Sequence, residues 1–263
     1  MVELAPVLAD LTAECEDLDG IVGAMPGADW QRPTPSPGWT VAHQIAHLAW
    51  TDRRALDAAI DPDHFTAHLG EAAADPTGFV DRAAAEVVGQ PPDQLLQFWR
   101  AGRTELAAAL SSTPRTSKLI WYGPPMSATS MATARLMEVW AHGQDVADAL
   151  GITRQPTGRL RNVAHLGVRT RDFAFAANGK PPPTDSFRVE LTAPDGTTWD
   201  WGPPDAAQRV TGPAADFCLL ITQRRHRDDL SITFVGPDAD SWLDLAQAFA
   251  GPPGSGRERG QFR

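Results

Sequence analysis

The sequence predicts an α+β protein in which a helical bundle is followed by a smaller domain of mixed strands and helices. Two observations support this fold class. Apolar residues recur at steps of three and four through most of the first two thirds of the chain, as in amphipathic helices. Beyond the proline-rich segment NGKPPPTD at 178–185, short alternating stretches typical of strands replace them. We therefore expect two domains, at residues 1–180 and 181–252, and a disordered tail at 253–263.

The helices expected in the first domain are separated by residues that start or break helices. Prolines interrupt the chain between 24 and 40, Thr40 and Ser127 are suitable N-cap residues, and Gly151 is a typical stop signal. The expected helices span residues 4–24, 40–60, 79–89, 92–112, 127–151 and 158–177.

The second domain is expected to combine short strands with helices. The segment APDG at 193–196 has the composition of a turn between two strands, and Pro213 stands at a plausible first position of a helix. The expected strands span residues 187–191, 197–202, 208–210 and 230–236, and the expected helices span 213–225 and 241–251.

Composition and charge exclude several classes of function. The formal net charge is −10, from 23 basic and 33 acidic residues, which disfavours nucleic acid and anionic membrane surfaces as partners. The chain has no apolar run long enough for a spanning helix and no signal-peptide pattern, so we expect a cytoplasmic protein. Cys15 and Cys218 lie in apolar helical patterns and are expected to be buried, unreactive thiols. The oligomeric state is not indicated.

Three polar residues on the helix expected at 127–151 carry the strongest chemical signal. Glu138, His142 and Asp145 are spaced by four and three, so they lie on one stripe spanning roughly 60° of the helix. A glutamate and a histidine one turn apart can chelate a single metal ion, and zinc accepts both kinds of donor. The same spacing also occurs in ordinary surface pairs of helices, so the pattern alone leaves both interpretations open.

Two other pairs of histidines have helical spacing. His43 and His47 lie one turn apart, but the apolar stripe of their helix is centred more than about 90° from His47. Periodicity therefore favours a surface or boundary position for His47. His64 and His68 fall in the polar stretch 61–76, which we interpret as a loop with solvated histidines.

Two segments resemble signatures of the DinB superfamily. GWTVAHQIAHLAW at 38–50 resembles its W-(S/T)-V…A-H-L signature, and MEVWAHGQDVADALG at 137–151 resembles its later E-x-x-x-H-x-x-D helix. Within that superfamily the chain resembles the mycothiol-dependent maleylpyruvate isomerases and related actinobacterial metal-binding proteins. The resemblance covers roughly residues 5–178 and, more weakly, the C-terminal domain. It implies a DinB-like four-helix bundle.

The resemblance also implies a set of site residues. Matched position by position, the metal ligands are His47, Glu138 and His142, and Asp145 would orient a ligand histidine from outside the coordination sphere. Family members often carry an acid three residues after the capping threonine, where this chain has His43. This change replaces a capping-box partner, and the sequence leaves open whether His43 contacts the metal.

The chemistry that the resemblance implies is thiol-dependent. Three protein donors leave a position open on zinc or another divalent metal. In this family a low-molecular-weight thiol such as mycothiol loses its proton there and adds to a small electrophilic substrate, which is then isomerised or kept as an S-transfer product. Arg224 or Arg225 of the C-terminal domain would bind a substrate carboxylate, although capping of a helix C-terminus explains them equally well. A non-catalytic metal-binding or interaction module and a metal-dependent hydrolase remain as alternatives.

Overall fold

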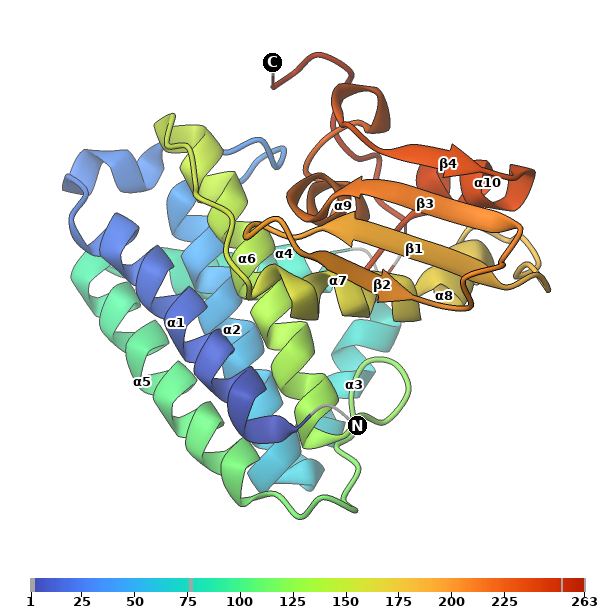
Figure 1. Cartoon of the computed structure of the whole chain (residues 1–263). Coiled ribbons are helices and arrows are strands. Elements are labelled where there is room, and N and C mark those ends of the chain that lie inside the picture. Colours follow the sequence, from blue (N-terminus) through green and yellow to red (C-terminus); the bar gives the residue numbers. More distant parts are fainter. Residues whose placement is uncertain (1–2, 76–77, 252, 263) are drawn as a thin grey trace. The chain divides into compact units, whose positions relative to one another are not determined.

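The computed structural model describes residues 3–75, 78–251 and 253–262, and the chain divides into two compact units between Arg154 and Gln155 (Figure 1). Helices and a small sheet are both present, so the predicted α+β class is confirmed. The boundary expected at residue 180 differs from this division. The difference arises because the helices between 160 and 177 pack against later helices of the second unit.

The first unit is a helical bundle. In chain order its elements are α1 (Leu4–Gly23), a short 3-10 helix η1 (Gly27–Gln31), α2 (Val41–Ile60), α3 (Pro62–Ala74), α4 (Phe79–Val88), α5 (Pro92–Ser112) and α6 (Ala128–Leu150). Helices α1, α2, α5 and α6 pack along one another, which is the four-helix bundle expected for the first domain (Figure 1).

Helix α2 is the central helix of this bundle, because it packs against α3, α4, α5 and α6. It contributes Ile45 and Leu48 to one buried cluster and Leu56 to a second. Its polar residues Gln44 and Asp52 are buried as well, with exposed fractions of 0% and 2%. Polar groups held away from water must find partners inside the protein, so the bundle has to supply contacts for this helix on several sides.

The polar stretch interpreted as a loop forms helix α3, and that expectation was wrong within the described residues. The side chain of Asp61 accepts a hydrogen bond from the backbone N–H of His64 at 3.1 Å, and Pro62 occupies the first helical position. Phe65 is fully buried and fixes the helix against the bundle. A cap and the packing of Phe65 and Leu69 against the bundle therefore order a segment whose composition suggests a loop.

The second unit surrounds a small sheet. Its elements are α7 (Leu160–Arg169), α8 (Arg171–Ala177), β1 (Phe187–Thr192), β2 (Thr198–Trp201), β3 (Gln208–Pro213), α9 (Ala214–Ile221), η2 (Arg227–Asp229), β4 (Thr233–Val235) and α10 (Pro237–Leu245). The strand order is β2-β1-β3-β4, with β1 and β3 parallel and both outer pairs antiparallel. Val189 lies opposite Val210 in the central pair, and both are buried.

The second unit departs from the sequence predictions at three helices. The helix expected at 158–177 is divided at Thr170, whose hydroxyl donates to the carbonyls of Gly167 and Gln247 at 3.2 and 2.8 Å. Pro213 ends β3 and is the N-cap residue of α9, which begins at Ala214, one position later than expected. The last helix begins at Pro237 and ends at Leu245, earlier than expected.

The C-terminal segment, expected to be disordered, contacts the rest of the second unit. The backbone N–H of Gly260 donates to the Asp229 carboxylate at 2.6 Å. The guanidinium of Arg225 lies 4.1 Å from the ring centre of Phe262. Residues 253–262 thus form no helix or strand but are held by polar and cation–π contacts.

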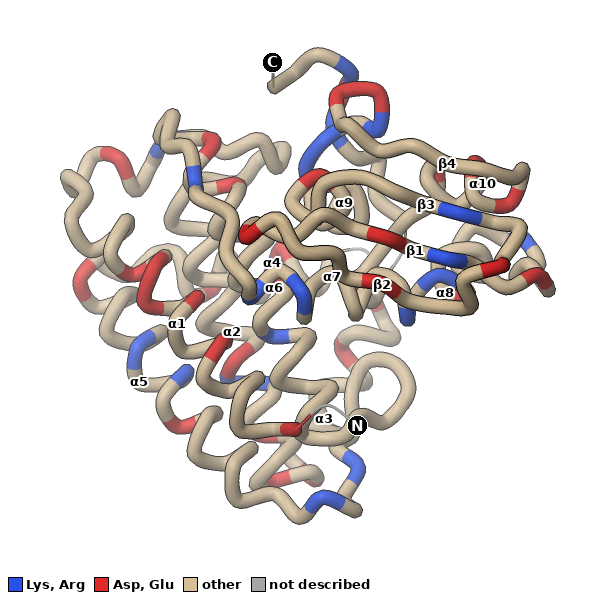
Figure 2. The backbone as a smooth tube through the Cα atoms, in the orientation of Figure 1, with Lys and Arg blue, Asp and Glu red and all other residues tan. Residues whose placement is uncertain are grey.

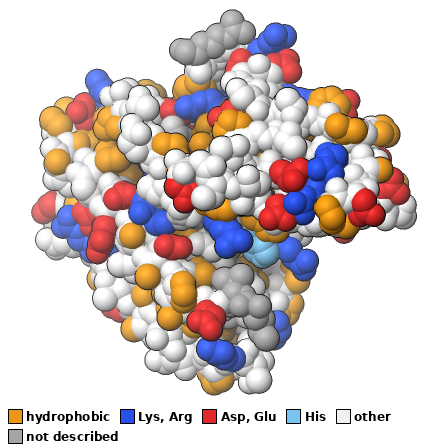
Figure 3. Space-filling model, in the orientation of Figure 1, with side chains coloured by type: hydrophobic (Ala, Val, Ile, Leu, Met, Phe, Trp, Pro, Cys, Tyr) orange, Lys and Arg blue, Asp and Glu red, His pale blue; other side chains and the backbone are white. Residues whose placement is uncertain are grey.

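Charged residues of both signs occur along the described parts of both units (Figure 2). Acidic and basic groups intermingle over the face shown in Figure 3, although the formal net charge is −10. Among the helices of the described residues, none is long and apolar enough to cross a membrane.

Candidate metal centre

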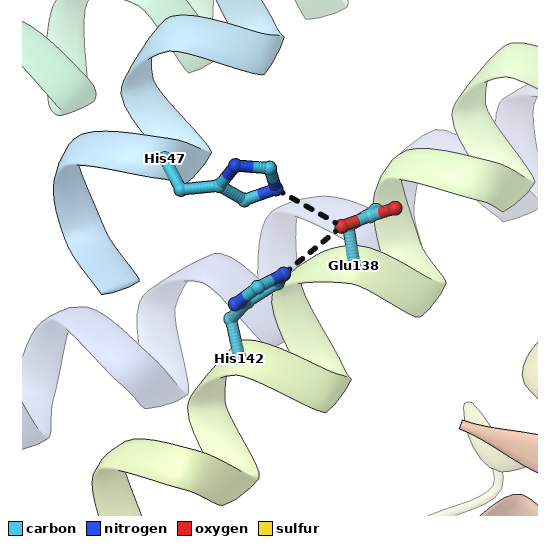
Figure 4. Close-up of side chains that lie close together, drawn as sticks. All are labelled: His47, Glu138 and His142. Carbon is cyan, nitrogen blue, oxygen red and sulfur yellow. Dashed lines mark hydrogen bonds and ion pairs between the residues drawn. The ribbon is translucent and has the colours of Figure 1, made fainter. Parts of the chain in front are cut away.

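His47, Glu138 and His142 meet on the facing sides of α2 and α6 (Figure 4). Both imidazoles turn Nε2 toward the same carboxylate oxygen, Glu138 Oε2, at 3.4 Å from His47 and 3.1 Å from His142. Glu138 and His142 stand one turn apart on α6, as their spacing predicts. One potential donor atom from each residue lies within 4.8 Å of the other two.

The environment of these donors favours an ionised carboxylate. Burial raises the pKa of Glu138, but hydrogen bonding and electrostatic attraction from His142 and His47 outweigh that effect and hold the pKa well below its usual value. His47 is buried, with 7% of its surface exposed, and the other two side chains are partly buried. The site therefore presents a negative oxygen and two imidazole nitrogens in a largely dry setting.

Gln44 contacts the nitrogen of His142 that does not face this cluster. Its Oε1 lies 2.5 Å from Nδ1 of His142, and its Nε2 donates to Oγ1 of Thr34 at 2.9 Å. An amide oxygen can only accept, so Nδ1 of His142 carries the proton in this contact. The lone pair of a neutral His142 ring then lies on Nε2, directed at Glu138.

Two tryptophans flank the histidine rings. The Trp39 ring lies 6.0 Å from His142 in a stacked arrangement and 5.4 Å from His47, measured between ring centres. Its indole N–H donates to the carboxylate of Asp81 on α4 at 2.9 Å. Trp50 lies 6.2 Å from His47. These rings limit the orientations that the two imidazoles can adopt.

His43 serves the start of α2. Its Nδ1 accepts the backbone N–H of Thr40 at 3.2 Å, so the histidine itself acts as the capping-box partner that we expected it to replace. The group of converging donors among the described residues does not include His43. Burial lowers the pKa of His43, against the opposing charge of Asp81.

Asp145 and the α3 histidines are not among the three converging donors of the described residues, and the expected role of Asp145 in orienting a ligand histidine stays a proposal. Asp145 is fully buried and accepts a hydrogen bond from the hydroxyl of Ser36 at 3.1 Å. This contact ties the loop before α2 to helix α6. His64 is about half exposed and lies 3.3 Å from Asp57, while His68 lies 3.4 Å from Glu71.

Arg224 and Arg225 follow α9 in the second unit. Their guanidiniums donate to the carbonyl oxygens of Thr222 and Arg224, both at 2.7 Å. These contacts resemble the helix-end capping that the sequence offered as the ordinary explanation. A role at the substrate stays a proposal.

The two cysteines are buried, as expected, with exposed fractions of 3% for Cys15 and 0% for Cys218. Burial raises the pKa of both thiols far above the usual value. Neither is suited to act as a nucleophile at neutral pH.

The donor set fits a divalent cation such as zinc. With Nδ1 of His142 donating to Gln44, a neutral His142 ring turns an unprotonated Nε2 toward an ionised carboxylate oxygen 3.1 Å away, and these two acceptors repel each other unless a proton on Nε2 or a metal ion lies between them. A cation between them removes that repulsion. Two imidazoles and one carboxylate are also the ligand types of open zinc sites.

Comparison with known proteins defines the family. Residues 11–147 match the family model described as the mycothiol maleylpyruvate isomerase N-terminal domain, which covers the helices that hold the donor cluster. The chain belongs to this family. A second model, described as wyosine base formation, matches residues 183–233.

Close relatives occur in Mycobacterium tuberculosis. Two proteins described as uncharacterized, from strains CDC 1551 and H37Rv, are each 58% identical over 257 residues, covering 98% of this chain and 100% of theirs. Among solved structures, mycothiol-dependent maleylpyruvate isomerase shares the fold with a TM-score of 0.60 and 17% identity, over 89% of this chain and 93% of the other. A histidine-to-alanine mutant of that enzyme gives a TM-score of 0.60 at 16% identity, over 88% and 93%.

Alanine substitutions at the two histidines of α2 should distinguish the histidine that binds the metal from the one that caps the N-terminus of the helix. His47→Ala should abolish most metal binding, because its Nε2 is one of the three converging donors. His43→Ala should retain the metal and lower the free energy of unfolding by about 1 kcal/mol, since it removes a capping contact. Metal analysis after gel filtration and urea denaturation would measure both effects. The opposite ranking of metal loss would mean that His43 is the ligand.

Proposed function

We propose that this protein is a zinc-dependent enzyme that uses a low-molecular-weight thiol for isomerisation or S-transfer on a small electrophilic substrate. The observation that carries the proposal is the convergence of His47, Glu138 and His142 within 4.8 Å in a member of the mycothiol maleylpyruvate isomerase family. Mycothiol is the thiol named for the solved relatives, and a mycothiol-like thiol is the cosubstrate that we propose here.

The protein's own residues provide the setting for this chemistry. When bound, zinc supplies a Lewis acid that lowers the pKa of a thiol. Glu138, His47 and His142 hold the ion, and Trp39 and Trp50 keep the imidazoles oriented. Because both cysteines are buried, neither can serve as the nucleophile, and an external thiol must supply it. Its thiolate forms a C–S bond as the electron pair of a C=C π bond moves onto the electron-withdrawing group of the substrate. Rotation about the resulting C–C single bond follows, and return of the electron pair with cleavage of the C–S bond gives the isomer and regenerates the thiolate.

A substrate with a carboxylate needs a cationic partner. We propose Arg224 or Arg225 for this role, because a guanidinium binds a carboxylate through two parallel hydrogen bonds. We propose a small-molecule substrate because the net charge of −10 repels nucleic acid and anionic membrane surfaces. A cytoplasmic location, where such thiols are kept reduced, is consistent with this proposal.

Calorimetry with mycothiol should show tight binding to the zinc form and much weaker binding to the apo form. Deprotonation of the thiol on binding releases a proton, so affinity should increase as pH rises toward the free thiol pKa of about 8.5. Titrations in two buffers of different ionisation enthalpy would measure the number of protons released.

The arginine variants test the substrate contact. If Arg224→Ala or Arg225→Ala loses turnover while it still binds the thiol, that arginine contacts the substrate.

Equal binding of the thiol to the zinc and apo forms would overturn the thiol mechanism. So would the absence of binding at millimolar thiol while zinc itself is held. A metal-dependent hydrolase or a non-catalytic metal-binding module would then be the better assignment.

A further inference from the structure

We propose that Gln44 is a positioning residue that sets the orientation and tautomer of the metal ligand His142. It acts through a hydrogen-bonded chain that begins at the backbone carbonyl of Trp39 and passes through Thr34. This inference rests on the proposed metal site, and none of the three residues was singled out as part of that site by its sequence pattern. Through this chain, the loop before α2 would influence the metal site, although it supplies no ligand.

The polarity of the chain follows from its first member. A carbonyl oxygen can only accept, so the Thr34 hydroxyl donates its single hydrogen to Trp39 O at 2.9 Å. The oxygen of Thr34 is then an acceptor for Nε2 of Gln44, at 2.9 Å. With the amide nitrogen fixed toward Thr34, Oε1 must face His142, where it lies 2.5 Å from Nδ1. Each contact thus dictates the donor in the next one.

The last contact determines the state of the ligand. A proton held on Nδ1 of His142 leaves the lone pair on Nε2, the atom 3.1 Å from Glu138. Gln44 is fully buried, so water cannot replace it readily as the partner of Nδ1. Hydrogen bonds of this kind orient metal-bound histidines and raise their basicity.

The other ligand histidine is held differently. Nδ1 of His47 is buried, and within the described part of the chain it has no hydrogen-bond partner. Its ring lies between Trp39 and Trp50, at centre distances of 5.4 and 6.2 Å. Packing therefore orients His47, whereas a hydrogen bond orients His142. A change at Gln44 should act on the His142 side of the site.

Gln44→Leu should weaken zinc binding by roughly 10- to 100-fold, as expected for loss of an outer hydrogen-bond partner. Zinc affinity would be measured by competition with a chromophoric chelator, and the visible absorption of the cobalt form would report a change in coordination geometry. Gln44→Glu, which keeps an acceptor for Nδ1, should restore most of the affinity. Gln144→Leu is the matched control, because Gln144 on α6 donates to Asp148 at 2.8 Å instead.

Thr34→Val tests the chain independently of any folding defect at the buried position 44. It removes the hydroxyl that fixes the amide, so zinc affinity should decrease, by less than in Gln44→Leu, with the cobalt spectrum shifted in the same direction. Wild-type zinc affinity in folded Gln44→Leu, or in Thr34→Val, would overturn the positioning role while leaving the metal site intact. Failure of the wild-type protein to bind zinc or cobalt would overturn the proposed function itself.

Discussion

Replacing His142 with alanine should remove nearly all bound metal from the purified protein. The wild-type chain is expected to hold close to one divalent ion, and two remaining donors bind zinc weakly. The loss of affinity should exceed the roughly 10- to 100-fold expected for an outer hydrogen-bond partner, because a donor atom is lost. Elemental analysis of protein purified without added metal would give the stoichiometry, and chelator competition would give the affinity.

His64→Ala and His68→Ala are the matched controls for this experiment. Both residues lie on α3 and contact acidic side chains outside the donor cluster, at 3.3 Å from Asp57 and 3.4 Å from Glu71. Their removal should leave metal content unchanged. If His142→Ala retained a full equivalent of metal with wild-type affinity, the proposed site would be wrong.

The part of the site on α6 could be predicted from spacing. Glu138 and His142 are one turn apart on a helix whose start and stop are marked by Ser127 and Gly151, and the structure has both caps. Local rules are sufficient there, because both donors belong to the same regular element. Spacing could not say whether the pair was a surface contact or part of a cluster, since that depends on α2.

The position of His47 shows where periodicity fails. A helical wheel separates a buried face from an exposed one only when the helix has one exposed face. Helix α2 packs against four other helices, so His47 is buried although it lies off the main apolar stripe. Only the family resemblance indicated this residue. Sequence reasoning also missed Gln44. A polar residue that is buried because several helices surround α2 cannot be recognised from the spacing of apolar residues.

The limits of the fold prediction have similar physical causes. Helix α3 is stabilised by the cap at Asp61 and by the packing of Phe65 and Leu69, which its polar composition conceals. The boundary between the two units lies before residue 180 because α7 and α8 pack against α9 and α10 of the second unit. These contacts join distant parts of the sequence, so local patterns do not reveal them. The helix break at Thr170 depends on a hydrogen bond to Gln247, far along the chain.

A buried ion pair lies beside the donor cluster on the same two helices. Asp52 of α2 and Arg135 of α6 are each 2% exposed, and Nε of Arg135 lies 2.9 Å from Oδ1 of Asp52. Arg135 also donates to the hydroxyl of Thr51 at 2.6 Å. Burial raises the pKa of Asp52, against the opposing effect of the Arg135 guanidinium.

Arg135→Met should therefore lower the free energy of unfolding by about 3–5 kcal/mol, because it leaves an uncompensated carboxylate inside the bundle. The pKa of Asp52 is already raised in the folded state, and without Arg135 it should rise further. A carboxyl group whose pKa is higher in the folded than in the unfolded state disfavours folding when it is ionised. It therefore costs no stability at low pH and lowers the free energy of unfolding as pH rises. The deficit of the variant should therefore shrink as pH falls from about 8 toward about 5. Urea denaturation across this range would measure it.

Two further variants decide whether the buried charge is the cause. Arg53→Met removes an exposed partner of Glu105, at 3.2 Å, and should cost no more than about 1 kcal/mol. Adding Asp52→Leu to Arg135→Met removes the stranded carboxylate, so most of the lost stability should return. A deficit in Arg135→Met that stays constant with pH and persists in the double variant would instead indicate lost packing around the Arg135 side chain. The ion pair would then have no electrostatic role in holding α2 against α6.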